Sequence, residues 1–480
     1  MSAPYRIAGA TGEWEIVVGL EVHCELSTAT KLFCSCANRF GAEPNTNVCP
    51  VCLGLPGSLP VLNRHAVELA MAIGTALGCE IRPSVFHRKN YFYPDMPKDY
   101  QVTQYDEPIN VAGALELADH ARVGIVRAHL EEDTGKTTHA GTSGRIHGAD
   151  YSLVDYNRSG VPLVEIVSAP DIRSSAQARA YAAELRAILI ATGASDGRME
   201  EGSMRVDANV SVRRAGQPYG TRCEIKNLNS LRSLQRAIDY EAARQVDLLE
   251  SGEVVRQETR HWDEVRGVTA TMRVKEEADD YRYFREPDLV DLAPDAAWVR
   301  RVQSGLGPLP AERRAALLAR VGEVSEAQLD AIATVIDAGL DAVVRDAIDR
   351  GVEPTLALAR AANELGSEGR AVAAEAFAET LLMEQRGELS ATQSKAVLAA
   401  LADTGGDPHA IAAERGFERL SPDSLGVTLG AIIDEHPDEW RRYREGDDKL
   451  AQFFVGLVMK ATRGQADGKA VITALSARRD

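Results

Sequence analysis

The residues best suited to chemistry stand at 129–136, His-Leu-Glu-Glu-Asp-Thr-Gly-Lys, soon after an apolar run at 123–126. Three consecutive carboxylates beside a lysine at the end of a predicted strand call for a counter-ion. Proteins hold Mg²⁺ with one or two carboxylates together with substrate phosphates, so this stretch favours phosphoryl transfer. A solvated surface turn is the alternative interpretation, because charge runs are mostly surface features.

The end of this stretch, Thr134-Gly-Lys-Thr137, is similar to the end of a phosphate-binding P-loop. The full motif needs a glycine at position 130, where this chain has leucine. Without a glycine-rich cradle, the backbone N–H groups that would bind phosphate are not supplied. We therefore reject a P-loop.

A second pair of polar residues lies on a strand predicted at 13–26. Glu21 and His23 share one face of this strand, two residues apart, so both can contact one ion or one substrate. Solvent-facing polar side chains are the alternative. The other face is apolar and consists of Trp14, Ile16, Val18, Leu20 and Val22.

Four cysteines stand in two close pairs, Cys34 with Cys36 and Cys49 with Cys52. Two such pairs suit tetrahedral Zn²⁺, although a single residue between the first two cysteines is an unusual spacing. A redox pair and inert buried thiols are the alternatives. We expect a structural zinc site.

Residues 89–105 interleave five aromatic residues with two lysines. Such a stretch can stack a nucleotide base. It can equally form an irregular aromatic core with lysines at its rim. The sequence leaves both interpretations open.

Two further acids stand on predicted strands. Glu165 interrupts a short apolar strand, where a carboxylate is costly unless it is paired or bound to metal, and a salt bridge to Arg158 is the alternative. Strand 204–213 alternates, which gives Asp207 a polar face to share with Arg205 and Asn209. Helices are predicted after Ser174, which forms a capping box with Gln177, and after residue 229.

The composition is that of a globular protein: 480 residues, 45% hydrophobic, 26% charged and a net charge of -17. This charge disfavours nucleic-acid binding by the whole surface but permits a local basic patch. The chain shows no signal-like start and no apolar run long enough for a membrane helix, so we expect a soluble cytosolic protein. The seven cysteines are then free or metal-bound.

The composition changes near residue 295, because twelve of the thirteen tyrosines precede it. The remainder is alanine-rich with helical periodicity and prolines at intervals, which predicts short helices. The last forty residues carry nine Lys and Arg against five Asp and Glu, so this tail is a candidate nucleic-acid contact. Solvated helix faces would look similar.

Taken together, the motifs resemble those of the B subunits of aspartyl/glutamyl-tRNA amidotransferases, and the match runs almost from end to end. The pieces that carry the resemblance are Gly19-Leu-Glu-Val-His23, Arg88-Lys-Asn-Tyr-Phe-Tyr-Pro-Asp95, the stretch 129–136, Pro162-Leu-Val-Glu-Ile-Val167, Arg205-Val-Asp-Ala-Asn209, Asp280-Tyr-Arg-Tyr-Phe284 and residues 453–464, Phe-Phe-Val-Gly-Leu-Val-Met-Lys-Ala-Thr-Arg-Gly.

The resemblance implies an α+β fold: a mixed or antiparallel-sheet cradle at 1–295, an all-α helical domain at 296–405 and a small helical tRNA-binding tail at 406–480. The family uses ATP to phosphorylate the side-chain carboxylate of misacylated Glu-tRNA(Gln) or Asp-tRNA(Asn). Ammonia from a separate glutaminase of the amidase type then gives Gln-tRNA(Gln) or Asn-tRNA(Asn). The glutaminase, the present chain and a third, small protein form a heterotrimer.

Carried onto this sequence, the resemblance implies a Mg²⁺ site of His23, Glu132 and Glu165, with Glu21 and Asp207 in the same cavity. Alternation along the strand cannot choose between Glu131 and Glu132, and the family motif favours Glu132. Phosphate-facing roles are carried over to Lys89 and Lys226 as hypotheses. The cysteine quartet, Cys34, Cys36, Cys49 and Cys52, is similar to that of the zinc-binding members.

Two rival functions remain. The first is a tRNA-binding scaffold without catalysis of its own, which would not need Glu21, His23, Glu132 and Glu165 to converge. The second is a stand-alone metal-dependent phosphatase or nuclease, which would hydrolyse phosphoesters without aminoacyl-tRNA. The chain has no glycine- and serine-rich amidase stretch, so ammonia is expected from a partner.

Overall fold

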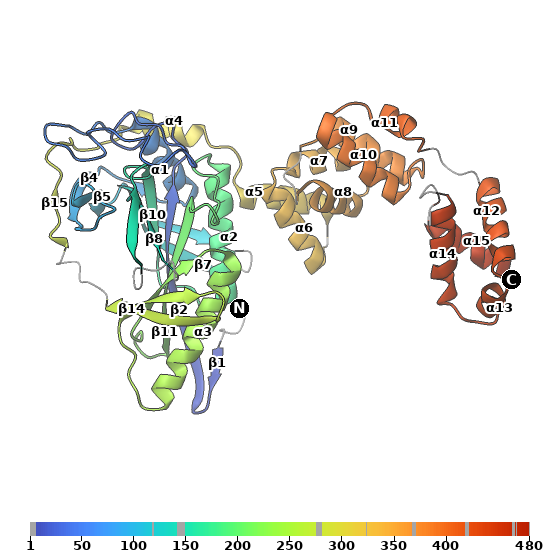
Figure 1. Ribbon diagram of the computed structural model, residues 1–480, viewed down its shortest axis with the longest axis horizontal. Coiled ribbons are helices and arrows are strands. Elements are labelled where there is room, and N and C mark those ends of the chain that lie inside the picture. The colour runs from blue at the N-terminus through green and yellow to red at the C-terminus, as the bar shows by residue number, and fades with distance from the viewer. Residues whose placement is uncertain are drawn as a thin grey trace. The chain divides into compact units, whose positions relative to one another are not determined.

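The computed structural model divides the chain into two compact units, Met1–Leu309 and Pro310–Asp480. The first unit is built on a large sheet and the second is helical, which confirms the predicted α+β class (Figure 1). Asp280, Arg463 and Gly464, which complete two of the motifs, lie outside the described residues. These are 6–117, 120–141, 149–274, 281–322, 324–366, 371–417, 422–462, 466 and 468–479.

Thirteen strands of the first unit form one mixed sheet with the order β14-β13-β12-β11-β2-β10-β7-β5-β4-β15. Strand β1 pairs with β2, and β6 pairs with both β3 and β7. Among the described strands, all pairs are antiparallel except β12 with β13. The strands are β1 (Arg6–Gly9), β2 (Gly12–Glu25), β3 (Glu80–Ile81), β4 (Val85–Asn90), β5 (Tyr100–Glu107), β6 (Asn110–Glu116), β7 (Arg122–Glu132), β10 (Pro162–Ser168), β11 (Met204–Arg213), β12 (Cys223–Leu228), β13 (Glu258–Asp263), β14 (Val268–Val274) and β15 (Phe284–Arg285).

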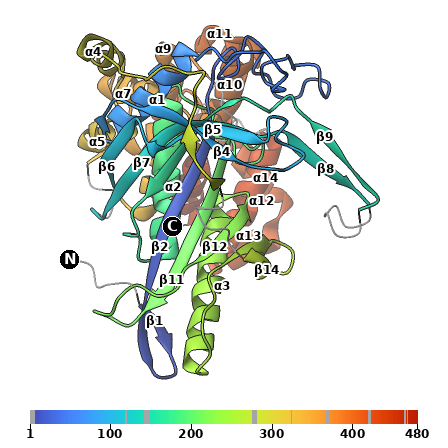
Figure 2. The same ribbon diagram turned by 90° about the vertical axis from the view of Figure 1, so that its left-hand side faces the viewer.

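A separate hairpin pairs β8 (Lys136–Ala140) with β9 (Tyr151–Asp155). Figure 2 shows it extending away from the large sheet. It begins directly after the acidic stretch, so the carboxylates stand where the chain leaves the sheet.

Strand β2 is the centre of the first unit and confirms the strand predicted at 13–26. Its alternating apolar residues are buried, because one face of the strand packs into the core. That core continues into three helices: α1 (Arg64–Ala76), α2 (Ser175–Ala191) and α3 (Leu231–Glu250). These helices pack against strands β6, β7, β11, β12 and β14 and against one another (Figure 2).

Side-chain caps fix where these helices begin. The Asn63 side chain accepts hydrogen bonds from the first N–H groups of α1, and the hydroxyl of Ser174 accepts one from the Gln177 N–H at 3.1 Å. Ser230 does the same for α3. These bonds satisfy N–H groups that the first helical turn leaves without a partner. The helix predicted after Ser174 is confirmed.

The first unit ends with α4 (Ala296–Ser304), and the second contains two hydrophobic cores. One core runs from Leu317 to Ala412 and the other from Leu425 to Leu475. The helices are α5 (Pro310–Val321), α6 (Glu326–Asp337), α7 (Asp341–Asp349), α8 (Pro354–Arg360), η2 (Ala361–Leu365), α9 (Ala374–Gln385), α10 (Ala391–Thr404), α11 (Pro408–Glu414), α12 (Pro422–Glu435), α13 (Pro437–Arg444), α14 (Leu450–Ala461) and α15 (Gly468–Arg479).

The boundaries predicted at 295 and 405 stay predictions. The compact units divide at 309, and α11 packs on α9 and α10 rather than within the last core. In the part of the chain that the structure describes, no helix is long and apolar enough to cross a membrane.

Candidate active site

The face of β2 turned away from its apolar residues borders a cavity of about 1500 Å³. Neighbouring strands bring polar side chains to the same face, because residues opposite one another in paired strands share a side of the sheet. Thus His23 of β2 lies opposite Glu165 of β10 and Arg205 of β11, and Glu21 lies opposite Asp207.

His23, Glu131 and Glu165 form the tightest group in this cavity. Their candidate ligand atoms all lie within 4.8 Å of one another. The Nε2 atom of His23 is 3.5 Å from a Glu165 oxygen and 3.8 Å from a Glu131 oxygen. One nitrogen and two carboxylate oxygens at this spacing can converge on a single divalent cation, so the donor set fits a metal ion.

The Mg²⁺ site expected from His23, Glu132 and Glu165 stays a prediction, and in this structure Glu131, not Glu132, lies beside His23 and Glu165. Adjacent strand residues point to opposite faces. Strand pairing sets Thr103 of β5 opposite Glu131, and this register turns Glu131 into the cavity.

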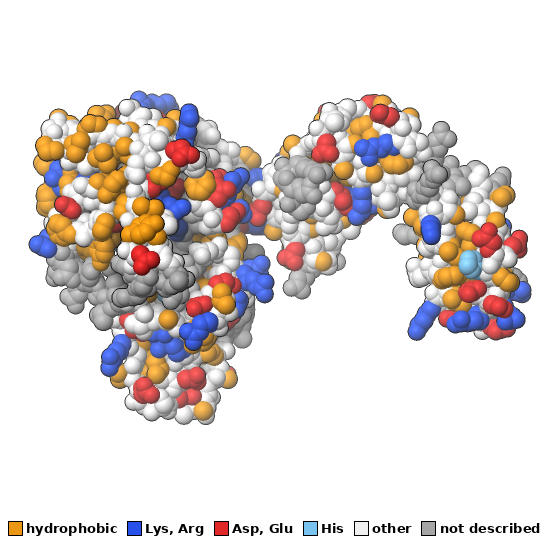
Figure 3. Space-filling model, viewed as in Figure 1, with side chains coloured by type: hydrophobic (Ala, Val, Ile, Leu, Met, Phe, Trp, Pro, Cys, Tyr) orange, Lys and Arg blue, Asp and Glu red, His pale blue; other side chains and the backbone are white. Residues whose placement is uncertain are grey.

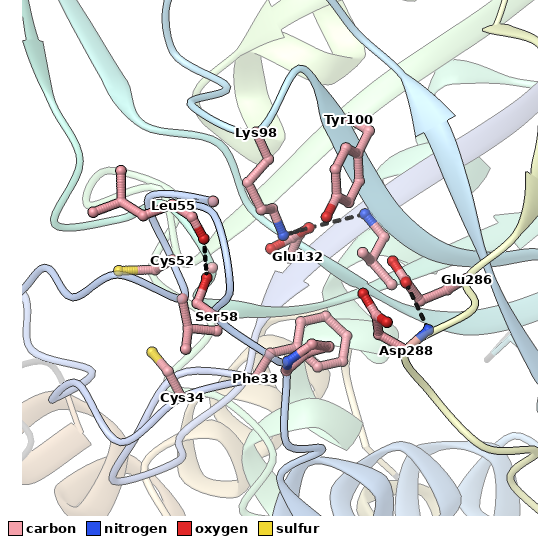
Figure 4. A pocket seen from close by; sticks show the side chains of 15 residues that line it. Phe33, Cys34, Cys52, Leu55, Ser58, Lys98, Tyr100, Glu132, Glu286 and Asp288 are labelled. Atoms are coloured by element: carbon pink, nitrogen blue, oxygen red, sulfur yellow. Dashed lines mark hydrogen bonds and ion pairs between the residues drawn. The ribbon is translucent and has the colours of Figure 1, made fainter.

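Glu132 lies on the opposite face and lines a separate small pocket (Figure 4). Its carboxylate forms an ion pair with Lys98 and accepts a hydrogen bond from the Val102 N–H at 2.9 Å. Both charged side chains are almost fully buried, at 2% and 8% exposed. The pocket also contains Cys34 and Cys52, so Glu132 faces the cysteine loop.

The charges of the cavity reinforce one another. Burial disfavours the charged imidazole of His23, but the hydrogen bond and charge of Glu165 outweigh it and raise the pKa of His23. Burial likewise opposes ionisation of Glu165. The hydrogen bond from His23 and the charges of His129 and Arg127 nevertheless hold the Glu165 pKa far below its usual range. Glu165 is thus a carboxylate at neutral pH.

The remaining predicted residues also line the cavity. Lys226 donates to Asp207 at 2.6 Å and lies 3.2 Å from Glu224, and these two charges raise its pKa despite its burial. Glu21 accepts a hydrogen bond from the Asn209 amide at 2.9 Å. Glu21, His23, Glu165, Asp207 and Lys226 thus line one cavity, whereas Glu132 lines the separate pocket, and the roles given to these residues stay predictions.

Lys89 completes the predicted set from the other end of the sheet. It lies near the end of β4, and its ammonium stands 4.7 Å from the centre of the Tyr281 ring. It lines the same cavity as His23. The stretch 89–105 therefore contributes to the cavity wall rather than to a closed aromatic core.

The sequence did not single out a second buried cluster beside the first. The guanidinium of Arg205 donates to Asp133 at 2.6 Å, and Arg158 lies 3.5 Å from the same carboxylate. Burial and the neighbouring Asp133 raise the pKa of Glu25 to about 8. Asp133 keeps its charge, because Arg205 and Arg158 lower its pKa against the effect of burial.

One partnership differs from the alternative considered for Glu165. Arg127, rather than Arg158, lies near Glu165, at 3.4 Å. His129 is fully buried, and its Nε2 is 3.7 Å from Glu131. The alternation that places His23 on the polar face of its strand also places Glu25 on that face. The position of Glu25 could therefore have been predicted from the sequence. The partnership of Asp133 with Arg205 spans 72 positions and has no local signal.

The four predicted zinc cysteines lie together. Their sulfur atoms are within 4.8 Å of one another, so the set fits one tetrahedral metal ion. A hydrogen bond from Cys34 lowers the pKa of Cys52 to about 5, which favours a thiolate there. Within the described residues, this quartet and the group of His23, Glu131 and Glu165 are the two candidate metal clusters.

Comparison with known proteins agrees with the motifs. Residues 16–300 match a family model described as the GatB/GatE catalytic domain, and residues 355–478 match one described as the GatB domain. A protein of Frankia casuarinae, named as the B subunit of aspartyl/glutamyl-tRNA(Asn/Gln) amidotransferase, is 49% identical, covering 95% of this chain and 94% of the relative. A Moorella thermoacetica protein of the same name is 47% identical over 95% and 97%. This chain belongs to the family of amidotransferase B subunits that carry the GatB/GatE catalytic domain.

Proposed function

We propose that this chain is the ATP-dependent component of a tRNA amidotransferase. It phosphorylates the side-chain carboxylate of Glu-tRNA(Gln), Asp-tRNA(Asn) or both, and ammonia then replaces the phosphate to give the amide. The observation that carries the proposal is the convergence of His23, Glu131 and Glu165 inside a large charged cavity. The names of the relatives support the same reaction.

The metal ligands in this proposal are His23, Glu131 and Glu165. Bound there, Mg²⁺ supplies charge neutralisation on the phosphates of ATP. Glu21 and Asp207 lie beside these ligands on the same face of the sheet. The carboxylate of the substrate attacks the γ-phosphorus and ADP leaves. Ammonia then attacks the acyl carbon, phosphate leaves, and one proton is released as the amide forms.

The cations of the cavity hold the transferring phosphoryl group in this proposal. Lys226 is kept charged and fixed by Asp207 and Glu224. Lys89 approaches from the other wall, beside Tyr281. A lysine near the phosphoryl group stabilises the negative charge that develops on it in the transition state. The lysine forms no covalent bond in this step.

The partners proposed are an amidase-type glutaminase, which supplies ammonia, and a third, small protein. Apolar side chains are exposed in the loop that carries the cysteines: Phe40 at 76%, Leu55 at 48%, Leu59 at 65% and Val61 at 75%. Figure 3 shows hydrophobic side chains gathered over this end of the first unit. An exposed apolar patch fits a contact with another protein of the complex, and structural zinc would order its loop.

We further propose that the helical tail holds the tRNA and that the complex works in the cytoplasm. The last turn of α13 carries Arg441, Arg442 and Arg444. Arginines on one helix end suit phosphate contacts.

A scaffold without catalysis would have no use for three converging ligands and a charged cavity, so the catalytic role is favoured.

The test uses this chain assembled with its glutaminase and small partner proteins. Wild type, Glu131→Gln and the exposed control Glu253→Gln are assayed for phosphate release and for Gln-tRNA formation, with and without Glu-tRNA(Gln). We expect both activities to require the charged tRNA and to fall at least about a hundredfold in Glu131→Gln. Normal turnover in Glu131→Gln would mean that the metal ligands are elsewhere and would revive the scaffold function.

A further inference from the structure

Five tyrosines from three parts of the chain line the cavity. Two follow β4, one stands on β5 and two precede β15. The side chain of Asn90, next to the first pair, donates to the backbone carbonyl of Tyr281 at 2.8 Å, so these segments are adjacent. We call the five residues the tyrosine wall: Tyr91, Tyr93, Tyr105, Tyr281 and Tyr283.

The rings of the tyrosine wall are ordered in nearly parallel pairs. Tyr105 and Tyr283 stack with centroids 5.1 Å apart and planes at 13°, and Tyr91 stacks on Tyr93 at 4.6 Å and 26°. Tyr281 meets Tyr283 edge-on at 6.1 Å. Parallel rings that face a cavity can accept another flat ring in the same stack.

The polar surroundings of the tyrosine wall suit a nucleotide rather than a plain apolar ligand. Lys89 and Arg127 lie over the rings of Tyr281 and Tyr105, at 4.7 Å and 4.6 Å from the centroids. Each cation covers one face of its ring and can also supply counter-charge to a phosphate in the cavity. Tyr93 is 42% exposed, so part of the wall is open to a ligand.

The tyrosine wall also borders the proposed metal site. Tyr105 is two residues from Thr103, which lies opposite Glu131. A base stacked on this wall would lie in the same cavity as Glu131 and Glu165.

We propose that the tyrosine wall stacks an adenine base next to the metal site. This inference rests on the proposed function, in which two substrates bring adenine: ATP and the 3′-terminal adenosine of the charged tRNA. The chemistry of recognition is the same for both, because stacking reads the flat ring. The experiment therefore has one arm for each source.

The first measurement is photo-cross-linking on the assembled complex. The probes are 8-azido-ATP and tRNA(Gln) ending in 8-azidoadenosine, and adducts are mapped by mass spectrometry. We expect one probe to label residues 89–105 or 281–284, and excess unmodified ligand to suppress the adduct. No label from either probe, in a complex that still makes Gln-tRNA, would overturn the tyrosine wall and leave the proposed function intact. Label in a complex that forms no amide would support the tyrosine wall and contradict the proposed function.

The second measurement compares Tyr93→Leu with Tyr93→Phe, because only phenylalanine keeps the ring. Tyr93→Leu should raise KM about tenfold for the substrate whose probe cross-links and change kcat little, while Tyr93→Phe should stay near wild type. Tyr151→Leu on the β8–β9 hairpin removes an exposed tyrosine outside the wall and serves as the control. Unchanged KM values for both substrates in Tyr93→Leu and in Tyr91→Leu would refute the stacking role.

Discussion

Glu131 and Glu132 are neighbours in β7, yet their carboxylates lie in different surroundings. Glu131 meets two histidines, His23 and His129, on the cavity side. Glu132 meets Lys98 on the other side, where both charges are buried. A buried ion pair contributes little net stability, but the loss of one partner leaves an uncompensated charge.

Substitution of Glu132 is therefore expected to destabilise the first unit. Glu132→Ala leaves Lys98 buried without its partner and should lower the free energy of unfolding by about 3–5 kcal/mol. The double variant Glu132→Ala, Lys98→Met removes both charges and should cost much less than the sum of its single variants. Denaturant unfolding of the wild type, the two single variants and the double variant measures this coupling. Additive losses would show that the two side chains do not interact in solution.

The pair of Glu25 and Asp133 predicts a pH dependence. Glu25 has a folded-state pKa of about 8, above its unfolded value, so the folded protein holds a proton that the unfolded chain releases. Stability from this group is full below about pH 4.5 and is lost as the pH rises toward about 8. Wild type should lose a few kcal/mol between roughly pH 5 and pH 8.

Glu25→Gln should remove most of that loss, because its amide cannot release a proton. Unfolding in urea at several pH values tests this, with the exposed Glu253→Gln as control. A Glu25→Gln protein that weakens with pH as steeply as wild type would contradict the raised pKa. Loss of the hydrogen bond to Asp133 would instead lower stability equally at every pH.

At the scale of elements, the segment between β2 and α1 has little regular structure and depends on side-chain links. The side-chain amide of Asn63, at the end of the segment, donates hydrogen bonds to the backbone carbonyls of Thr30 and Lys31. The cysteine quartet brings together four residues from the middle of the segment. Zinc binding to such a quartet contributes directly to the folding of the segment.

Cys52→Ser is expected to reduce bound zinc from about one ion per chain to a small fraction and to speed hydrogen exchange across residues 32–63. Cys79→Ser, which alters a half-buried cysteine outside the quartet, should keep the zinc. Metal analysis and exchange mass spectrometry measure both effects. Full zinc content in Cys52→Ser would show that this thiol is not a ligand.

At the scale of the whole molecule, charge is distributed unevenly. The chain carries a net charge of -17, whereas its last forty residues hold nine basic against five acidic side chains. A local positive surface on an acidic protein directs a polyanion to one region. The tail is thus the proposed contact for tRNA, separate from the chemistry of the first unit.

Replacing Arg441, Arg442 and Arg444 with glutamine should weaken tRNA binding and reduce the slope of log K against log salt by up to about 3. The KM for ATP should not change. The matched control replaces three exposed arginines of the second unit outside the tail, Arg320, Arg350 and Arg386, which lowers the net charge equally. Binding is measured at several salt concentrations. An equal loss in the control would mean that overall charge, not the tail, controls affinity.

Local patterns in the sequence were enough to predict which residues share a face. Alternation placed Glu21 and His23 together and predicted β2, and a serine with a glutamine three residues later predicted the start of α2. The cysteine spacing predicted the quartet. These features depend on neighbours within a few positions, because strand and helix periods are local properties.

Only the tertiary structure shows which of Glu131 and Glu132 faces the cavity that contains His23. A shift of one residue in register exchanges the two faces of a strand, and the register of β7 is set by its pairing with β10 and β5. The contacts of Asp133 with Arg205 and of Glu132 with Lys98 join distant parts of the chain. Such pairings form because the whole chain buries its apolar faces together. No single segment of the sequence carries enough information to predict them.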